Sequence, residues 1–131
     1  MKVIFTNGCF DVIHRGHIEL LKYAKSLGDR LVVGLNSDNS IKKNKGPERP
    51  INNQADRIAV LESLVFVDDI IIFEEDTPIN LIKQINPDII VKGGDYEKEN
   101  IVGSDICEVR IFGYIDGYST TKTIKDTLDR R

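Results

Sequence analysis

Two histidines stand on either side of a glycine in the stretch His14-Arg15-Gly16-His17, and the chain contains no others. Residues three positions apart share one face of a helix, so both imidazoles would point the same way at a helix start. The N–H groups and the dipole at a helix N-terminus attract anions, and imidazole N–H groups add further donors. The pattern therefore predicts a phosphate site on His14 and His17, where Gly16 keeps side-chain bulk away from the ligand.

Two other interpretations of these histidines stay open. They could be surface side chains at the start of a helix, or they could form a metal pair. A zinc site has weak support, because the sequence has no HExxH pattern and few thiolates nearby. The sequence also has no Walker A motif, no GxGxxG fingerprint and no apparent Ser-His-Asp set. We therefore predict no metal ligands from the protein itself.

The turn before the histidines contains Gly8, Cys9, Phe10 and Asp11. Gly8 permits a close approach of the backbone to a ligand. Cys9 has no base placed beside it by the sequence, so we expect its backbone N–H, rather than its thiol, to face phosphate. We count Phe10 with this ligand-binding turn, and we expect Asp11 to be structural or to orient a metal or a loop.

A lysine-rich polar segment runs from Asn36 to Asn53, and we expect it to be a long loop. Lysine runs are usually solvated surface, which is one interpretation of Lys42, Lys43 and Lys45. The other is an arm that closes over a triphosphate and stabilises charge on the transferred phosphorus and the departing pyrophosphate. On this second interpretation Lys45 is catalytic and Lys43 binds the ligand.

Arg57 lies early in a predicted helix, where a cation opposes the helix dipole. It therefore needs a partner, which is either a surface carboxylate of the Asp56 type or an anionic ligand. We include Arg57 among the ligand-binding residues.

Two later segments also follow predicted strands. Gly94 and Asp95 would meet a ribose or a base, although a plain tight turn is the alternative interpretation. Ser119, Thr120 and Thr121 offer three hydroxyls and a second helix N-terminus to phosphate, although an ordinary N-cap needs only one of them.

The elements that position these residues follow from hydrophobic periodicity. Short, nearly continuous apolar runs predict strands at 2–5, 31–35, 70–73, 89–91 and 109–112. Helical spacing and capping residues predict helices at 17–27, 54–64, 77–85 and 119–128, and the polar segment 97–105 contains one helical turn. Alternating apolar strands and helices indicate one α/β domain over 1–131, with a Rossmann-like open parallel five-stranded sheet and helices on both faces. Ligands bind such sheets at the carboxyl ends of the strands, where the candidate segments lie.

The composition excludes several classes of protein. The formal net charge is −3, which argues against a protein that coats nucleic acid. The two cysteines match no disulfide or CxxC framework and are expected to be reduced thiols. We find no signal peptide and no apolar run of about 20 residues, so we expect no membrane association and a cytoplasmic location.

The motifs resemble those of the cytidylyltransferase-like HxGH nucleotidyltransferases, whose two signatures match residues 8–17 and 119–121. The resemblance covers essentially the whole chain. Within this family, the chain is most similar to the adenylyltransferases that make ADP-heptose from D-glycero-β-D-manno-heptose 1-phosphate, at segments 6–11, 34–38, 45–52, 75–78, 91–96 and 116–121. The glycerol-3-phosphate cytidylyltransferases are an alternative, but their final motif begins with an arginine where this chain has Tyr114. A non-catalytic nucleotide-binding sensor is the alternative from another class.

The resemblance implies attack by a sugar-phosphate oxygen on the α-phosphorus of ATP, or of CTP in the alternative, with release of pyrophosphate. It implies that His14 and His17 bind the bridging and β-phosphate oxygens, and that Lys45 with Lys43 holds the acceptor phosphate. It further implies Mg²⁺ bound with the triphosphate and a homodimer. The sugar-kinase domain that many members carry is not matched here, so we expect a separate kinase to supply the phosphorylated sugar. The segment between Ser104 and Glu108 is shorter than in the family.

Overall fold

The computed structural model describes residues 1–94 and 97–113. Asp95, Ser119, Thr120, Thr121 and the expected last helix lie outside the described residues. The described elements, in chain order, are β1 (Val3–Gly8), α1 (Arg15–Ser26), β2 (Arg30–Asn36), α2 (Asp38–Lys45), α3 (Gln54–Glu62), β3 (Asp69–Phe73), α4 (Ile79–Ile85), β4 (Ile89–Gly93), the 3₁₀ turn η1 (Lys98–Asn100) and β5 (Glu108–Phe112).

The described strands form one five-stranded sheet in the order β3-β2-β1-β4-β5, and every neighbouring pair is parallel. This confirms the predicted sheet. The chain builds outward from β1 through β2 to β3 and then returns to place β4 on the other side of β1. The order therefore reverses between β1 and β4, where Ile4 lies opposite Ile89 and Phe5 opposite Ile90. Parallel sheets bind ligands at such a switch point, beyond the carboxyl ends of the strands.

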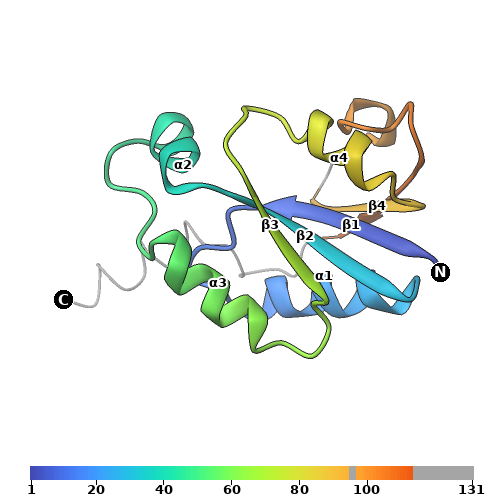
Figure 1. Ribbon diagram of the computed structural model, residues 1–131, viewed down its shortest axis with the longest axis horizontal. Helices are drawn as coiled ribbons and strands as arrows, with labels where there is room; N and C mark the ends of the chain where they lie inside the picture. The colour runs from blue at the N-terminus through green and yellow to red at the C-terminus, as the bar shows by residue number, and fades with distance from the viewer. Residues whose placement is uncertain (95–96, 114–131) are drawn as a thin grey trace.

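Helices cover both faces of this sheet, as predicted. On one face, Leu21 and Ala24 of α1 and Leu61 of α3 pack with Ile4 and Val91 in one buried cluster. On the other face, a second cluster joins α4 and Ile101 to the strands, and its members are Phe5, Val32, Phe73, Leu81, Ile82, Ile90, Ile101 and Val109. Figure 1 shows α1 and α3 below the sheet and α4 above it. Strand alternation thus separates residues of β4, with Val91 on the α1 face and Ile90 on the α4 face.

The prediction of a long loop from Asn36 to Asn53 is wrong over its first half, because α2 spans Asp38–Lys45. Ser37 caps this helix by accepting a hydrogen bond from the Ser40 N–H. Asp38 lies in the first turn, and the lysines lie in the last turn, where each charge complements the helix dipole. Ile41 is buried and anchors the helix to the domain. The mainly polar composition of this segment therefore led to the wrong prediction of a loop where a short capped helix forms.

Other element boundaries differ by only a few residues from those expected. Helix α1 begins at Arg15, two residues earlier than expected, because His14 is its N-cap. Pro78 is the N-cap of α4 instead of its first helical residue, and the Thr77 hydroxyl before it accepts a hydrogen bond from the Ile79 N–H at 3.5 Å. Asn86 ends α4 in the left-handed conformation, as a C-terminal residue of this type commonly does.

Candidate active site

The two histidines close the N-terminus of α1 through a reciprocal capping arrangement. Nδ1 of His14 accepts a hydrogen bond from the Gly16 N–H at 3.0 Å, and Nδ1 of His17 accepts one from the His14 N–H at 3.1 Å. The two ring centroids lie 4.1 Å apart. Because each Nδ1 is an acceptor, the proton of each neutral ring lies on Nε2. The fold therefore fixes both rings as Nε2–H donors at a helix N-terminus.

Burial keeps both imidazoles neutral. It lowers the pKa of His14 below its ordinary value. It also lowers the pKa of His17 to about 4, where the charges of His14 and Lys45 act in the same direction and that of Asp11 opposes them. Neutral imidazoles at neutral pH suit the donation of hydrogen bonds to phosphate oxygens rather than general-acid catalysis.

This arrangement makes stability depend on pH. Between pH 6.5 and about 4 the unfolded chain protonates His17 while the folded chain does not. Stability is then fully present above the ordinary pKa of histidine and falls as the pH drops toward the folded value. After allowance for partial exposure, we expect a loss of roughly 2 kcal/mol in the free energy of unfolding. Urea unfolding across this range should show a smaller loss in His17→Gln, and an equal loss in both proteins would contradict the assignment.

Asp11 holds the segment that follows α2 against the histidine turn. Its carboxylate accepts hydrogen bonds from the N–H groups of Ile51 at 2.7 Å and Asn52 at 2.9 Å. Arg49 lies 3.6 Å from the same carboxylate, and its side chain is largely buried. Within the described residues, Nε and one terminal nitrogen of Arg49 have no hydrogen-bond partner. The expectation that Asp11 orients a loop is confirmed, and Arg49 adds a cation that sequence reasoning did not select.

The turn around Asp11 has an unusual backbone. Phe10 and Val12 adopt positive φ values of 47° and 52°. Such a conformation is strained for a bulky or β-branched residue and costs of order 1–3 kcal/mol, so the surrounding contacts must impose it. The Phe10 ring is buried and lies 5.5 Å from the His17 ring, between centroids. A Cβ added to Gly8 would lie 3.2 Å from the Phe10 ring. Phe10 thus positions His17, and Gly8 makes room for Phe10.

Arg57 is buried beneath this turn, where its guanidinium binds groups of the protein. Its side chain is 1% exposed. The guanidinium makes four hydrogen bonds to the protein, to the carbonyls of Asn52, Cys9 and Asn36 and to the carboxylate of Asp38. Arg57 is thus a positioning residue that joins the ends of β1 and β2 to α2 and α3. A direct contact of Arg57 with a ligand stays a prediction.

Two lysines of α2, Lys43 and Lys45, have different neighbours. The ammonium of Lys43 lies 3.3 Å from the carboxylate of Asp76, and both side chains are exposed. Lys45 is also exposed, but it lies close enough to His17 and Lys92 for its charge to lower the pKa of both groups. The structure therefore brings Lys45, but not Lys43, toward the histidines.

Lys92, near the end of β4, is a member of this site that sequence reasoning missed. Its side chain is partly buried, and burial lowers the pKa of its ammonium. The charge of Cys9 raises that pKa and the charge of Lys45 lowers it, which places Lys92 near both residues. A lysine at the end of an otherwise apolar strand was the available signal. The backbone N–H of Gly94, which follows, donates to the carbonyl of Phe112 at 3.0 Å.

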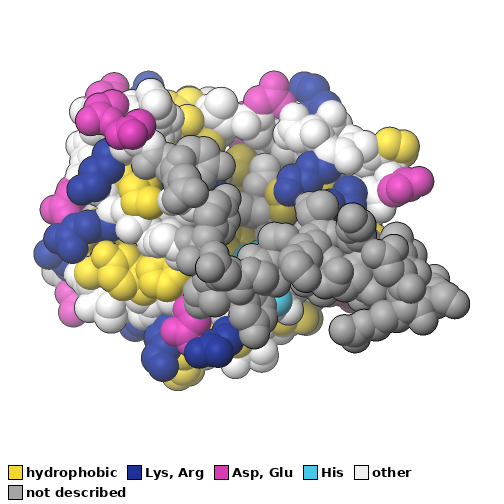
Figure 2. Space-filling view, turned by 180° about the vertical axis from the view of Figure 1, so that it is seen from behind, with side chains coloured by type: hydrophobic (Ala, Val, Ile, Leu, Met, Phe, Trp, Pro, Cys, Tyr) yellow, Lys and Arg dark blue, Asp and Glu magenta, His cyan; other side chains and the backbone are white. Residues whose placement is uncertain are grey.

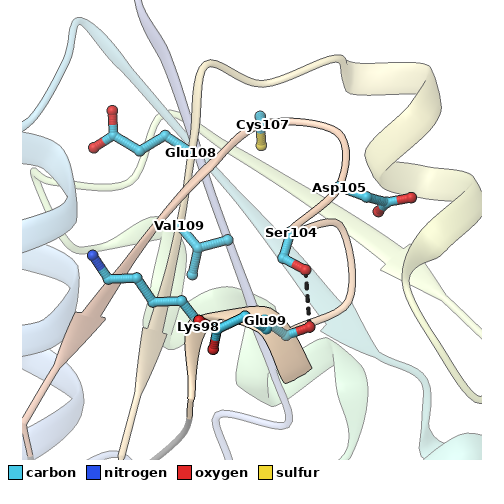
Figure 3. A pocket seen from close by; sticks show the side chains of 7 residues that line it. All are labelled: Lys98, Glu99, Ser104, Asp105, Cys107, Glu108 and Val109. Carbon is cyan, nitrogen blue, oxygen red and sulfur yellow. Dashed lines mark hydrogen bonds between the residues drawn. The ribbon is translucent and has the colours of Figure 1, made fainter.

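Figure 2, seen from the side opposite to that of Figure 1, shows parts of the histidine side chains and several Lys and Arg side chains on the same face. A hollow of about 370 Å³ lies elsewhere, beside the beginning of β5. Figure 3 shows its lining, where the Ser104 hydroxyl donates to the Glu99 carbonyl at 3.1 Å. Burial raises the pKa of its Cys107 thiol, which disfavours the nucleophilic thiolate. This hollow lies at the amino edge of the sheet and is separate from the candidate site.

In the described part of the chain, no three or more His, Cys, Asp or Glu residues gather as a metal site. Both oxygens of Asp11 accept hydrogen bonds from the backbone. The Asp11 carboxylate is therefore already bound by the backbone of the segment that follows α2. No helix among the described residues has the length and apolar character needed to cross a bilayer.

The chain is thus an α/β domain whose parallel sheet carries a helix N-terminus, two imidazole donors and nearby lysines at its switch point, an arrangement that suits an anionic ligand. The family model described as cytidylyltransferase-like matches residues 5–124. The chain belongs to the cytidylyltransferase-like family.

Several relatives extend this result. The chain is 56% identical over 131 residues to the bifunctional protein HldE of Campylobacter concisus, covering 99% of this chain and 28% of that protein. It is 56% identical to the protein of the same name in Aliarcobacter butzleri, covering 95% of this chain and 26% of that protein. It therefore spans only about a quarter of the length of these relatives.

Two solved structures have similar folds. The lipopolysaccharide core biosynthesis protein of Thermoplasma volcanium has a TM-score of 0.74 and 30% identity, with 91% of this chain and 99% of that chain covered. The pantoate-beta-alanine ligase of Francisella tularensis, complexed with beta-gamma ATP and beta-alanine, has a TM-score of 0.61 and 19% identity, with 86% and 59% covered. The second similarity concerns the fold alone.

Proposed function

We propose that this chain is a nucleotidyltransferase that condenses ATP with a sugar 1-phosphate, D-glycero-β-D-manno-heptose 1-phosphate, to give ADP-heptose and pyrophosphate. The observation that carries the proposal is the pair of Nε2–H donors fixed by the capping arrangement of His14 and His17 at the switch point. The family supports nucleotidyl transfer. The relatives named HldE and the lipopolysaccharide core biosynthesis protein support a sugar acceptor, because building such a core consumes activated sugars.

The proposed chemistry needs no protein nucleophile. An oxygen of the acceptor phosphate forms a bond to the α-phosphorus of ATP, the bond from that phosphorus to the β-bridging oxygen breaks, and pyrophosphate leaves with its electron pair. The acceptor phosphate is already an anion, so no base has to remove a proton. Donors and cations that match the developing charge then supply most of the catalysis.

The site residues take distinct parts in this reaction. His14 and His17 would donate to the bridging and β-phosphate oxygens, and Lys45 would hold the transferred and acceptor phosphates. Backbone groups at Gly8, Cys9 and Gly16 would approach the triphosphate. Gly94 and Asp95 are proposed to meet the nucleoside, and Ser119, Thr120 and Thr121 to bind the β- and γ-phosphates. Mg²⁺ would enter with the triphosphate and neutralise part of its charge.

The proposal extends to the setting of the reaction. We propose that the enzyme acts as a homodimer in the cytoplasm. A separate reaction of the sugar-kinase class would supply the phosphorylated sugar.

A nucleotide-by-acceptor matrix tests the proposed function. ATP and CTP are each mixed with Mg²⁺ and either D-glycero-β-D-manno-heptose 1-phosphate or glycerol 3-phosphate, and pyrophosphate release is measured. We expect turnover with ATP and the heptose phosphate. Turnover with CTP and glycerol 3-phosphate alone would instead identify a cytidylyltransferase. Binding of ATP without pyrophosphate release from any acceptor would identify a sensor.

A further inference from the structure

We propose that the Lys92 ammonium binds the phosphate of the acceptor, on the side of the reacting phosphorus opposite to the two histidines. The inference rests on the proposed function and adds to it a residue that selects and orients the second substrate. Two independent observations carry it, namely the face of the sheet from which Lys92 projects and the charge that surrounds it.

The first observation is the position of Lys92. It follows Val91, which is buried in the cluster on the α1 face, and it shares the opposite side of β4 with Ile90, which is buried in the cluster on the α4 face. Residues alternate along a strand, so Lys92 projects toward the α4 face. Consistent with this alternation, a Cβ added to Gly93 would meet Leu20 of α1 at 3.8 Å. Lys92 and the histidines of α1 therefore approach the switch point from opposite sides of the sheet.

The second observation is the charge balance around Lys92. In the part of the chain that the structure describes, no hydrogen bond or ion pair reaches its ammonium. Burial lowers the pKa of this ammonium most, the charge of Cys9 raises that pKa, and the nearby cation Lys45 lowers it. Taking an ammonium out of water without a carboxylate partner costs free energy. A phosphate bound between Lys92 and Lys45 would remove that cost, because one dianion can neutralise both charges. Among residues 1–94 and 97–113, Lys92 is therefore a partly buried cation without a carboxylate partner, and an arriving anion would offset the cost of its burial.

The geometry of the reaction indicates whether Lys92 binds the acceptor phosphate or the leaving pyrophosphate. In an in-line displacement the attacking oxygen and the leaving oxygen lie on opposite sides of the phosphorus. The histidines at the α1 terminus are suited to the leaving pyrophosphate, because helix-end N–H groups accompany them. The opposite side, where Lys92 projects, is then left for the acceptor phosphate. The charge of Lys45 lowers the pKa of both His17 and Lys92, so its ammonium could reach both proposed phosphate positions.

Lys92→Met tests the inference, since it keeps the unbranched stem of the side chain and removes the charged ammonium. We expect the KM for D-glycero-β-D-manno-heptose 1-phosphate to rise ~10- to 100-fold, the range for losing one charge-assisted hydrogen bond. The Kd for ATP with Mg²⁺, measured by calorimetry, should change less than about threefold, which is within the scatter of such effects. Lys92→Arg should recover part of the KM. Lys83→Met, at an exposed lysine of α4, is the matched control and should behave as the wild type.

A second readout separates this role from a structural one. Removing a partly buried ammonium that pairs with no carboxylate among the described residues should leave the Tm of the ligand-free protein unchanged or higher, so a lower Tm in Lys92→Met would overturn the inference. An equal loss of affinity for ATP and for the acceptor would also overturn it, because Lys92 would then serve the triphosphate. An unchanged KM of Lys92→Met for the heptose phosphate would also overturn the inference.

The two proposals fail in different ways. If the wild type released no pyrophosphate with any acceptor, the proposed function would fail. The Lys92 site would still be testable with inorganic phosphate, titrated into the protein saturated with a non-hydrolysable ATP analogue. Phosphate binding that Lys92→Met weakens and Lys83→Met does not would support the site, and equal binding in all three proteins would overturn it.

Discussion

His17→Ala should lower kcat by at least ~100-fold, the scale of losing one oriented donor to a charged transition state. The structure fixes the donor, because Nδ1 of His17 accepts from the His14 N–H and the ring proton therefore lies on Nε2. The substitution also removes half of the capping arrangement, so we expect about 1 kcal/mol of lost stability as well. Steady-state pyrophosphate release and urea unfolding measure the two effects.

His17→Gln is the control that separates catalysis from folding. Glutamine is a common residue at this position of a capping box, and its side-chain oxygen can accept the same backbone hydrogen bond. It cannot place a donor where imidazole Nε2 lies. We therefore expect near wild-type stability with kcat as low as in the alanine variant. A glutamine variant that recovers kcat would show that His17 acts only through the helix cap.

Arg57→Met should lower the free energy of unfolding by about 3 kcal/mol, the typical cost of breaking a buried charged network. The substitution leaves three backbone carbonyls and the Asp38 carboxylate without their donor. Guanidinium denaturation monitored by circular dichroism would measure the loss. Activity should fall too, since the Cys9 turn and the start of α2 are held by the same side chain.

Arg57→Lys separates this positioning role from direct ligand binding. Lysine keeps the positive charge but cannot make the forked set of hydrogen bonds. We expect it to be nearly as destabilising as methionine, with a KM for ATP that recovers when the protein is kept folded at low temperature. A fully stable Arg57→Lys variant with a raised KM for ATP would instead place Arg57 on the triphosphate.

The hydrophobic periodicity of the sequence was sufficient to predict most of the strands and helices. The apolar runs at β1, β2, β3, β4 and β5 are nearly continuous because both faces of a parallel sheet are covered, and this signal survives without tertiary information. The placement of His14 and His17 at a helix start also followed from local sequence. Local patterns failed at α2, where a cap at Ser37 and one buried residue, Ile41, outweigh a polar composition.

The site was harder to predict than the fold, because it depends on contacts between distant segments. Arg57 was expected at a ligand, and the carbonyls that bind it lie 48 and 21 positions away at Cys9 and Asn36. Lys43 was expected to bind the ligand with Lys45, and in the structure its ammonium lies 3.3 Å from the Asp76 carboxylate. The sequence marked Lys92 only as a lysine at the end of an apolar strand, and its place in the site followed from the strand order that puts β4 beside β1.

That strand order has a consequence for how the protein folds. At the β1–β4 seam, the Val3 N–H donates to the Asp88 carboxylate across 85 positions of sequence. Closing so long a loop is entropically costly and makes such a pairing a late, slow event in folding. The histidine turn can form early on β1 and α1, but Lys92 reaches it only when β4 docks. The chain should therefore gain its binding site in the same step that completes its sheet, and a bound ligand should slow hydrogen exchange in β4.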